Sequence, residues 1–186
     1  MTVDRSPSDG AIPVVPGYSL GECIRRDDRH RYFGATSARH GPVVVRLHAR
    51  PVPTERELAA TRHAAAVGAR LARVDGVVAH LDLVPSGRDL ALVTGVVDGG
   101  RRLRSFVGSA ATLVEICALG ASVASALSGV HRAGLVYGAL TPDSVLVDPS
   151  GAAYLADLER ASDVEAETSP LFGPSTVGTA LTYLSP

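Results

Sequence analysis

Few side chains in this sequence lie close enough together to carry out chemistry. Asp157 and Glu159 are carboxylates separated by one residue, a spacing that could attract a divalent cation or simply belong to a loop. The six histidines and two cysteines show no zinc-binding spacing. The serines, among them Ser86, Ser128 and Ser144, lie outside any G-x-S-x-G motif, so acyl transfer has no support. The sequence therefore offers one candidate cation site and no familiar nucleophilic centre.

The residue types that are missing exclude whole mechanisms. The 186 residues include no lysine, asparagine, glutamine or tryptophan, so all 18 basic residues are arginine. Any mechanism that needs a lysine amine or an asparagine amide is excluded, however the chain is aligned. The formal net charge is −1, and the arginine clusters at 25–31 and 101–104 have no interleaved aromatic residues, so we expect no nucleic-acid binding. Two cysteines are too few for a disulfide scaffold and favour a reducing compartment.

The first half of the chain carries the pattern of a small sheet with one helix. Residues 1–16 are rich in Ser, Pro, Gly and Asp and are expected to form a flexible arm. The charged run at 25–31 is expected to be a solvated hairpin tip, and Thr54 with Glu57 forms a capping box that predicts a helix start. β-Branched and alternating residues predict strands at 18–24, 32–37, 43–47, 77–84 and 90–97.

The second half carries one long helix and a short hairpin. Thr112 and Glu115 repeat the capping box, and apolar residues then recur every three or four positions, which predicts a helix over 112–131. Its apolar composition predicts that this helix is nearly buried. Strands are predicted at 145–148 and 153–156, followed by a loop-like tail. No run of about 18 apolar residues lacks charges or turn signals, so we expect no membrane span, and the N-terminus lacks the apolar run of a signal peptide.

The order of these elements, together with local motifs, resembles the bacterial serine/threonine protein kinase family over about residues 17–186. The stretches that carry the similarity are 41–46, similar to the strand ending in V-A-I-K; 92–99, similar to the hinge between lobes; 131–148, similar to the catalytic loop; 156–159, in the place of D-F-G; and 178–186, similar to the G-T-x-x-Y-x-A-P-E close of the activation segment.

The resemblance implies an α+β, protein kinase-like fold with two lobes. Residues 17–97 would form a lobe with a five-stranded antiparallel sheet and one helix, and residues 98–186 the first part of a helical lobe. The chain ends just before the glutamate of the last motif, so we expect a fragment of a longer chain or a truncated relative. A fragment would leave an apolar face of the 112–131 helix uncovered.

The resemblance also shows which catalytic parts are missing from the first lobe. The place of the glycine-rich loop, 25–31, holds no glycine, and Arg46 stands where the family has lysine. Arg46 could meet a phosphate, or form an ordinary ion pair with Asp157 or a neighbouring carboxylate. The expected helix glutamate is absent from 63–67, and Glu57 lies nearly three turns too early, at about 3.6 residues per turn.

The second lobe has lost its catalytic residues as well. Ala139 stands at the catalytic aspartate, and its methyl group cannot act as a base. Thr141 stands at the usual lysine and Ser144 at the metal-binding asparagine. Asp157 is intact at the metal-binding aspartate, while Leu158 and Glu159 replace the Phe and Gly of D-F-G.

These substitutions predict a pseudokinase, a catalytically inactive homologue that acts as a regulatory or scaffold module in serine/threonine phosphorylation signalling. One alternative is an atypical ATP-binding kinase with residual phosphotransfer, in which Arg46 and Asp157 form a vestigial nucleotide site and Asp157 holds magnesium. Another is a truncated, non-functional relative. No cofactor is required under the first prediction, although weak binding of ATP with Mg²⁺ remains compatible with it.

The tail carries candidate phosphorylation sites where the family has its activation loop. We expect protein partners, either an active kinase that modifies this segment or a phosphopeptide-reading domain that then docks there, against the alternative of a mobile polar loop. The setting is expected to be cytoplasmic, either as a separate protein or as the cytosolic part of a membrane-anchored one. The candidate sites are Thr168, Ser169, Ser175, Thr176 and Thr179.

Overall fold

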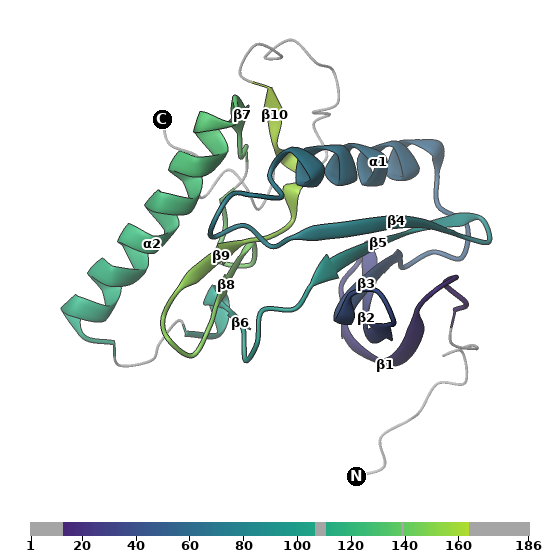
Figure 1. Cartoon of the computed structure of the whole chain (residues 1–186), viewed down its shortest axis with the longest axis horizontal. Coiled ribbons are helices and arrows are strands. Elements are labelled where there is room, and N and C mark those ends of the chain that lie inside the picture. Colours follow the sequence, from purple (N-terminus) through teal and green to yellow (C-terminus); the bar gives the residue numbers. More distant parts are fainter. Residues whose placement is uncertain (1–12, 107–110, 139, 164–186) are drawn as a thin grey trace.

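The computed structural model of the chain describes residues 13–106, 111–138 and 140–163. It is a mixed α and β structure with a five-stranded antiparallel sheet and two α-helices (Figure 1). The elements in chain order are β1 (Ser19–Arg26), β2 (His30–Ser37), β3 (Gly41–His48), α1 (Glu55–Arg70), β4 (His80–Ser86), β5 (Asp89–Gly95), β6 (Arg101–Arg102), the 3-10 helix η1 (Leu103–Phe106), α2 (Leu113–Arg132), β7 (Leu135–Val136), β8 (Val145–Val147), β9 (Ala153–Leu155), the 3-10 helix η2 (Leu158–Arg160) and β10 (Ser162–Asp163).

The five-stranded sheet has the order β1-β2-β3-β5-β4, and every neighbouring pair is antiparallel. β3 lies at its centre because its run of β-branched residues can be covered on both faces. Val43, Val45 and Leu47 face one side and are at most 2% exposed. Val44 and Arg46 alternate with them and therefore face the other side. The five predicted strands are confirmed, with ends shifted by a few residues.

Val77, predicted to begin a strand, instead joins the two halves of the molecule. It forms a parallel bridge with Leu155, at the end of β9. The backbone N–H of Leu155 donates to the carbonyl of Gly76 at 2.7 Å, and the N–H of Val78 donates to the carbonyl of Leu155 at 2.9 Å. β4 then begins only at His80.

Part of the predicted N-terminal arm is packed. Val15 is 2% exposed and belongs to the apolar cluster on the five-stranded sheet, together with Phe33 and Val93. Residues 1–12 lie outside the described part of the chain.

α1 begins as the sequence predicts and covers one side of the sheet. The Thr54 hydroxyl accepts the backbone N–H of Glu57, and the Glu57 carboxylate accepts the backbone N–H of Thr54 at 2.6 Å. Gly68 lets the helix approach β4, since a Cβ at this position would lie 2.2 Å from the ring of His80. This close contact fixes α1 against the sheet.

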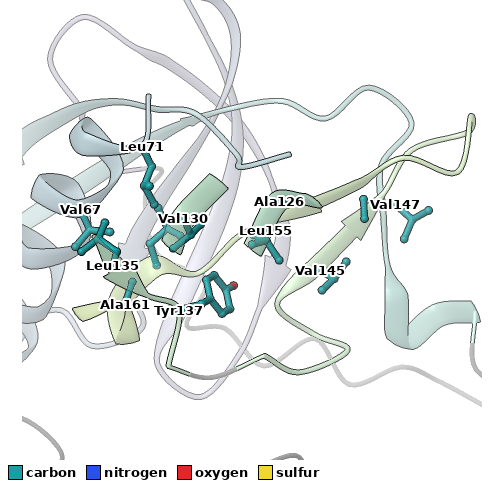
Figure 2. Close-up of a cluster of buried hydrophobic side chains, with 12 residues drawn as sticks. Val67, Leu71, Ala126, Val130, Leu135, Tyr137, Val145, Val147, Leu155 and Ala161 are labelled. Carbon is teal, nitrogen blue, oxygen red and sulfur yellow. The ribbon is translucent and has the colours of Figure 1, made fainter. Parts of the chain in front are cut away.

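A second apolar cluster joins α1 to the short strands (Figure 2). Val67 and Leu71 at the end of α1 meet Val130 of α2 and Leu155 of β9 in this cluster. Six of its twelve buried residues lie between the start of β7 and the end of β9: Leu135, Tyr137, Val145, Val147, Ala153 and Leu155. The cluster therefore holds the second half of the chain against the first.

α2 has the predicted capping box at Thr112 and Glu115, but the prediction that it is nearly buried is wrong. Its buried residues are confined to its C-terminal part, at Ala126, Gly129 and Val130. Leu113 is 76% exposed, and Figure 1 shows α2 at one end of the molecule. Apolar composition shows only what a helix could bury, and in the described residues α2 is left exposed over Leu113, Val114 and Ile116.

The exposed apolar side chains of α2 lie near its start: Leu113, Val114 and Ile116 are 76%, 77% and 55% exposed. α2 is 20 residues long with a mean hydropathy of 1.8, enough by length and composition alone for a helix to cross a membrane, and 17% of that stretch is buried. Glu115 in its first turn and Arg132 in its last shorten the uninterrupted apolar run.

Candidate functional site

A cleft of about 310 Å³ lies between the five-stranded sheet and the small strands of the second half. Most of its lining residues are apolar, but seven of the seventeen have polar side chains, His80, Thr94 and Tyr32 among them. Val44, Leu92 and Val97 line it from the sheet side, and Leu146 and Ala156 from the other. Three arginines and one carboxylate also line it, and these are Arg25, Arg46, Arg102 and Asp157.

Arg46 reaches the cleft from the centre of β3 and is 6% exposed. Its Nη2 atom lies 2.8 Å from Oε1 of Glu159, whose side chain is 15% exposed. α1 offers no acid at this level, because Thr61 and Ala64 occupy its buried face. The arginine at the expected lysine position is therefore held by a carboxylate of η2 rather than of α1, and its partner is Glu159 rather than Asp157.

His30 adds a second contact to Glu159. Its Nε2 atom lies 3.5 Å from Oε1 of Glu159. Burial, followed by the nearby Arg46 charge, lowers the pKa of His30 to about 4, so the ring is neutral at pH 7. Burial acts to raise the pKa of Glu159, but Arg46 and then His30 outweigh it and hold that pKa below its ordinary value.

The charged run between β1 and β2 forms an exposed hairpin tip at residues 26–29, as predicted, but His30 at its end is buried. Asp27 accepts the backbone N–H groups of Arg29 and His30 at 3.0 and 2.8 Å, and pairs with Arg25 at 2.7 Å. These bonds turn His30 inward, where it is 6% exposed. The guanidinium of Arg25 lies 4.0 Å from the centre of the Tyr32 ring, a cation–π contact at the mouth of the cleft.

Asp157 faces the cleft in an unusual backbone conformation. It has φ 59° and ψ 55°, and it is the single non-glycine residue with positive φ in the described ranges. Its Oδ2 atom lies 2.9 Å from Nη1 of Arg102 in β6. The same nitrogen of Arg102 also donates to the Asp143 carbonyl, so the arginine is fixed from two sides.

The two candidate cation ligands thus have different partners. Asp157 pairs with Arg102, whereas Glu159 pairs with Arg46. Within the described residues, no group of three or more His, Cys, Asp or Glu side chains could hold a metal ion. A divalent cation at Asp157 would have to displace a guanidinium.

Ser144, at the expected metal-binding position, has a structural role in a turn. Its hydroxyl accepts the backbone N–H of Thr141 and donates to the Thr141 carbonyl, both at 2.9 Å. The Tyr137 hydroxyl donates to the carbonyls of Ser144 and Ala156, and burial raises the pKa of Tyr137 above its ordinary value. The remaining predicted positions lie outside the described residues: Ala139, Thr168, Ser169, Ser175, Thr176 and Thr179.

A buried Asp–His–Thr chain lies behind the cleft, and no sequence spacing pointed to it. His48 Nδ1 lies 2.5 Å from Asp89 Oδ1, and the Thr61 hydroxyl lies 3.2 Å from His48 Nε2. Burial acts to raise the pKa of Asp89, but the hydrogen bonds from His48 outweigh it and lower that pKa. Such an order of groups can activate a hydroxyl, but His48 and Thr61 are 3% and 1% exposed and have no access to substrate. These three hydrogen-bonded side chains instead link β3, β5 and α1.

No protein-family model matches this sequence, and no curated protein matches it. The function is therefore argued from the cleft itself. Sequence reasoning identified Arg46 and Asp157, which both line the cleft, and allowed Arg46 an ion pair with a neighbouring carboxylate, which is Glu159. It named Glu159 only as a possible cation ligand and did not predict the pairing of Asp157 with Arg102.

Proposed function

We propose that the chain is a protein kinase-like module that does not transfer phosphate and that acts as a regulatory or scaffold component in serine/threonine phosphorylation signalling. The order of elements supports this: three strands, a helix, two strands, a long helix and a short hairpin. The cleft supports it too, because Arg46 and Asp157, placed by the resemblance at the lysine and metal-binding aspartate, line one cavity.

One observation carries the inactive part of the proposal: both of these side chains are neutralised by charges of the chain itself. Arg46 is paired with Glu159 at 2.8 Å and Asp157 with Arg102 at 2.9 Å. Phosphoryl transfer depends almost entirely on positioned charges that meet the phosphates and their metal ions. Charges already paired within the protein cannot serve this purpose without being separated first. The pairing of Arg46 is an ion pair by distance, since its buried Nη2 atom has no hydrogen-bond partner in the described part of the chain.

The test is a thermal-shift titration of the full chain with ATP, with and without Mg²⁺ or Mn²⁺. Saturation at a hundred times the dissociation constant would stabilise the fold by about 2.7 kcal/mol. We expect no metal-dependent shift and no transfer of labelled phosphate to a serine/threonine peptide. A metal-dependent shift that Asp157→Ala abolishes, accompanied by transfer, would overturn the proposal.

A second candidate function is an atypical ATP-binding kinase that uses Arg46, Asp157 and Mg²⁺. The observation that favours it is the cleft volume of about 310 Å³ with three arginines in its lining. This volume is at the lower end of the range for small-molecule sites, about 300–1,000 Å³. The labelled-phosphate assay separates this candidate from the first.

The proposed signalling role also includes protein partners in a cytoplasmic setting. Under this proposal an active serine/threonine kinase modifies the segment that holds Thr168 and Thr179. Incubation with such a kinase, followed by mass spectrometry, should then find phosphate on residues 162–182. A segment that stays unmodified would remove this part of the proposal.

A further inference from the structure

The segment that precedes β1 is docked on the five-stranded sheet. Val15 is 2% exposed and belongs to the apolar cluster of the sheet, while its neighbour Val14 is 81% exposed. A Pro–Gly pair follows, and Gly17 has the positive φ of 83° that the third position of a type II turn requires. The backbone N–H of Tyr18 donates to the Val15 carbonyl at 3.1 Å and closes the turn. These residues, 13–18, form the docked arm.

Alternate residues of β4 meet the docked arm. The hydroxyl of Tyr18 donates to Oδ2 of Asp82 at 3.0 Å, and the hydroxyl of Ser86 donates to the carbonyl of Val14 at 2.9 Å. Val84, which lies between them, belongs to the apolar cluster that the buried valine of the arm joins. Because alternate residues of a strand point to one face, β4 presents a carboxylate, an aliphatic side chain and a hydroxyl in one row.

This row lies on the side of the sheet away from the cleft. Val43 and Val45 share the apolar cluster with Val15. They alternate along β3 with Val44 and Arg46, which line the cleft. Docking of the arm and binding in the cleft therefore use opposite faces of the sheet.

The docked arm also joins the two edges of the sheet. β1 and β4 are the outermost strands in the order β1-β2-β3-β5-β4. The arm contacts β4 through Asp82 and Ser86 and continues directly into β1 at Ser19. Release of the arm would remove this direct link between the outer strands.

The contacts of the arm are few enough for it to detach. One buried aliphatic side chain and two hydrogen bonds give a separate peptide a dissociation constant in about the millimolar range. The arm is joined to β1, so its effective concentration at the site is about millimolar or higher. Pro13 and Pro16 restrict the free arm, which reduces the entropy that docking costs. The docked state is therefore favoured, and the released state is accessible.

We infer that this face of β4 is a docking site for a short peptide that carries an aliphatic residue, a Pro–Gly turn and a tyrosine. Asp82 accepts the tyrosine hydroxyl, the apolar cluster takes the aliphatic side chain, and Ser86 donates to a backbone carbonyl. Residues 13–18 are the occupant, as an intramolecular ligand that can detach while the rest of the fold persists. The inference is independent of the proposed function, because it concerns the face away from the cleft.

The first test is a matched pair of substitutions in the full chain, Val15→Asp and Val14→Asp. Both place the same charge on adjacent valines, but only the side chain of Val15 is buried. Val15→Asp should release the arm and raise amide hydrogen exchange in β4 at least about tenfold, whereas Val14→Asp should leave it unchanged. The amide of Leu155, in the second apolar cluster, should keep its wild-type exchange rate in both variants.

The second test restores docking with a separate peptide. The synthetic peptide of residues 13–18 is titrated to millimolar concentration into the isotope-labelled Val15→Asp chain, and the NMR signals of β4 should return toward their wild-type positions. A peptide with the Tyr18→Phe change should bind about fivefold more weakly, because it lacks the hydrogen bond to Asp82. A peptide with the Val15→Asp change should not bind.

The outcomes decide the inference in both directions. Faster exchange confined to β4, reversed by the wild-type peptide, supports it. An equal rise of exchange at Leu155 would make the arm an inseparable part of the core and overturns it. Unchanged exchange in β4, or a wild-type peptide that leaves the β4 signals in place, overturns it as well. Should Val15→Asp unfold the protein, the milder Tyr18→Phe change in the full chain decides by the same comparison of β4 with Leu155.

Discussion

The two α-helices of this molecule begin in the same way and end in different surroundings. Thr54 and Thr112 each form a capping box with a glutamate three residues later. α1 then lies against the five-stranded sheet, while the first half of α2 is exposed at one end of the molecule (Figure 1). The comparison shows that a local capping signal decides where a helix starts, whereas long-range packing decides how much the helix contributes to the stability of the fold.

Matched substitutions in the two helices measure this difference, and the largest effect is expected from leucine truncation. Leu71, at the end of α1, is 2% exposed, whereas Leu113 of α2 is 76% exposed. Leu71→Ala should lower the free energy of unfolding by about 2–5 kcal/mol, because it removes apolar contacts and leaves a cavity. Leu113→Ala should change it by less than about 0.5 kcal/mol. Urea unfolding of both variants gives the two values, and equal losses would mean that the exposed leucine is packed in solution.

Glycine substitutions sharpen the comparison at closer range. A Cβ at Gly68 would meet the His80 ring at 2.2 Å, whereas a Cβ at Gly120 in α2 would meet nothing within 4 Å. Gly120→Ala should stabilise its helix by about 1 kcal/mol. Gly68→Ala should destabilise the protein by about 2 kcal/mol despite the same gain in helix propensity, because it overpacks the contact with β4. Thermal unfolding would contradict this expectation if both variants gained stability.

Acid should destabilise the protein in part through His80, whose ring lies against Gly68 of α1. Burial, then the Arg46 charge, lowers the pKa of His80 to about 4, below its ordinary value of 6.5. A group whose folded-state pKa is depressed binds more protons when unfolded, so stability is lost as the pH falls from about 6.5 toward 4. His80 is partly exposed, and its contribution is on the order of 2 kcal/mol after allowance for solvent.

The check is urea unfolding of the protein at pH 7 and pH 4.5. His80→Phe should reduce the difference in stability between the two pH values. The matched variant in α2, His131→Phe, changes an exposed ring and should leave that difference as it is. An unchanged difference in His80→Phe would mean that His80 does not contribute to the acid sensitivity.

The smallest effect is expected from the two caps. Thr54→Ala and Thr112→Ala each remove the hydroxyl that accepts the N–H of the glutamate. Thr54→Ala should cost about 1 kcal/mol of global stability. Thr112→Ala should instead increase amide hydrogen exchange in the first turn of α2 and leave the free energy of global unfolding nearly unchanged. If both variants lost the same free energy of unfolding, the first turn of α2 would not unfold independently of the rest of the protein.

The comparison also shows which parts of the structure the sequence could predict. Both caps and all five strands of the sheet depend on residues close in sequence, such as Thr54 with Glu57 or the run at Val43, and these predictions are confirmed. The burial of α2 was predicted from composition alone, and it failed because composition does not say whether another element covers a helix.

The candidate site shows the same division between local and long-range information. Arg46 and Asp157 could be found by their places in linear motifs, and both line the cleft. The contact of Arg46 with Glu159 joins residues far apart in the chain and has no linear signature. The inward turn of His30 depends on backbone N–H groups that Asp27 accepts, which a charge pattern does not reveal.

The bridge between Val77 and Leu155 has a mechanical consequence. Its two backbone hydrogen bonds, to Gly76 at 2.7 Å and from Val78 at 2.9 Å, fix the first half of the chain to the end of β9. The apolar cluster that contains Val67, Leu71 and Leu155 also joins the two halves, next to this bridge. Bridge and cluster together resist sliding but permit a limited rotation, so they act as a fulcrum for the parts on either side. Any change in the width of the cleft must then be greatest at the rim farthest from Val77, near the hairpin of β1 and β2, and smallest beside Leu155.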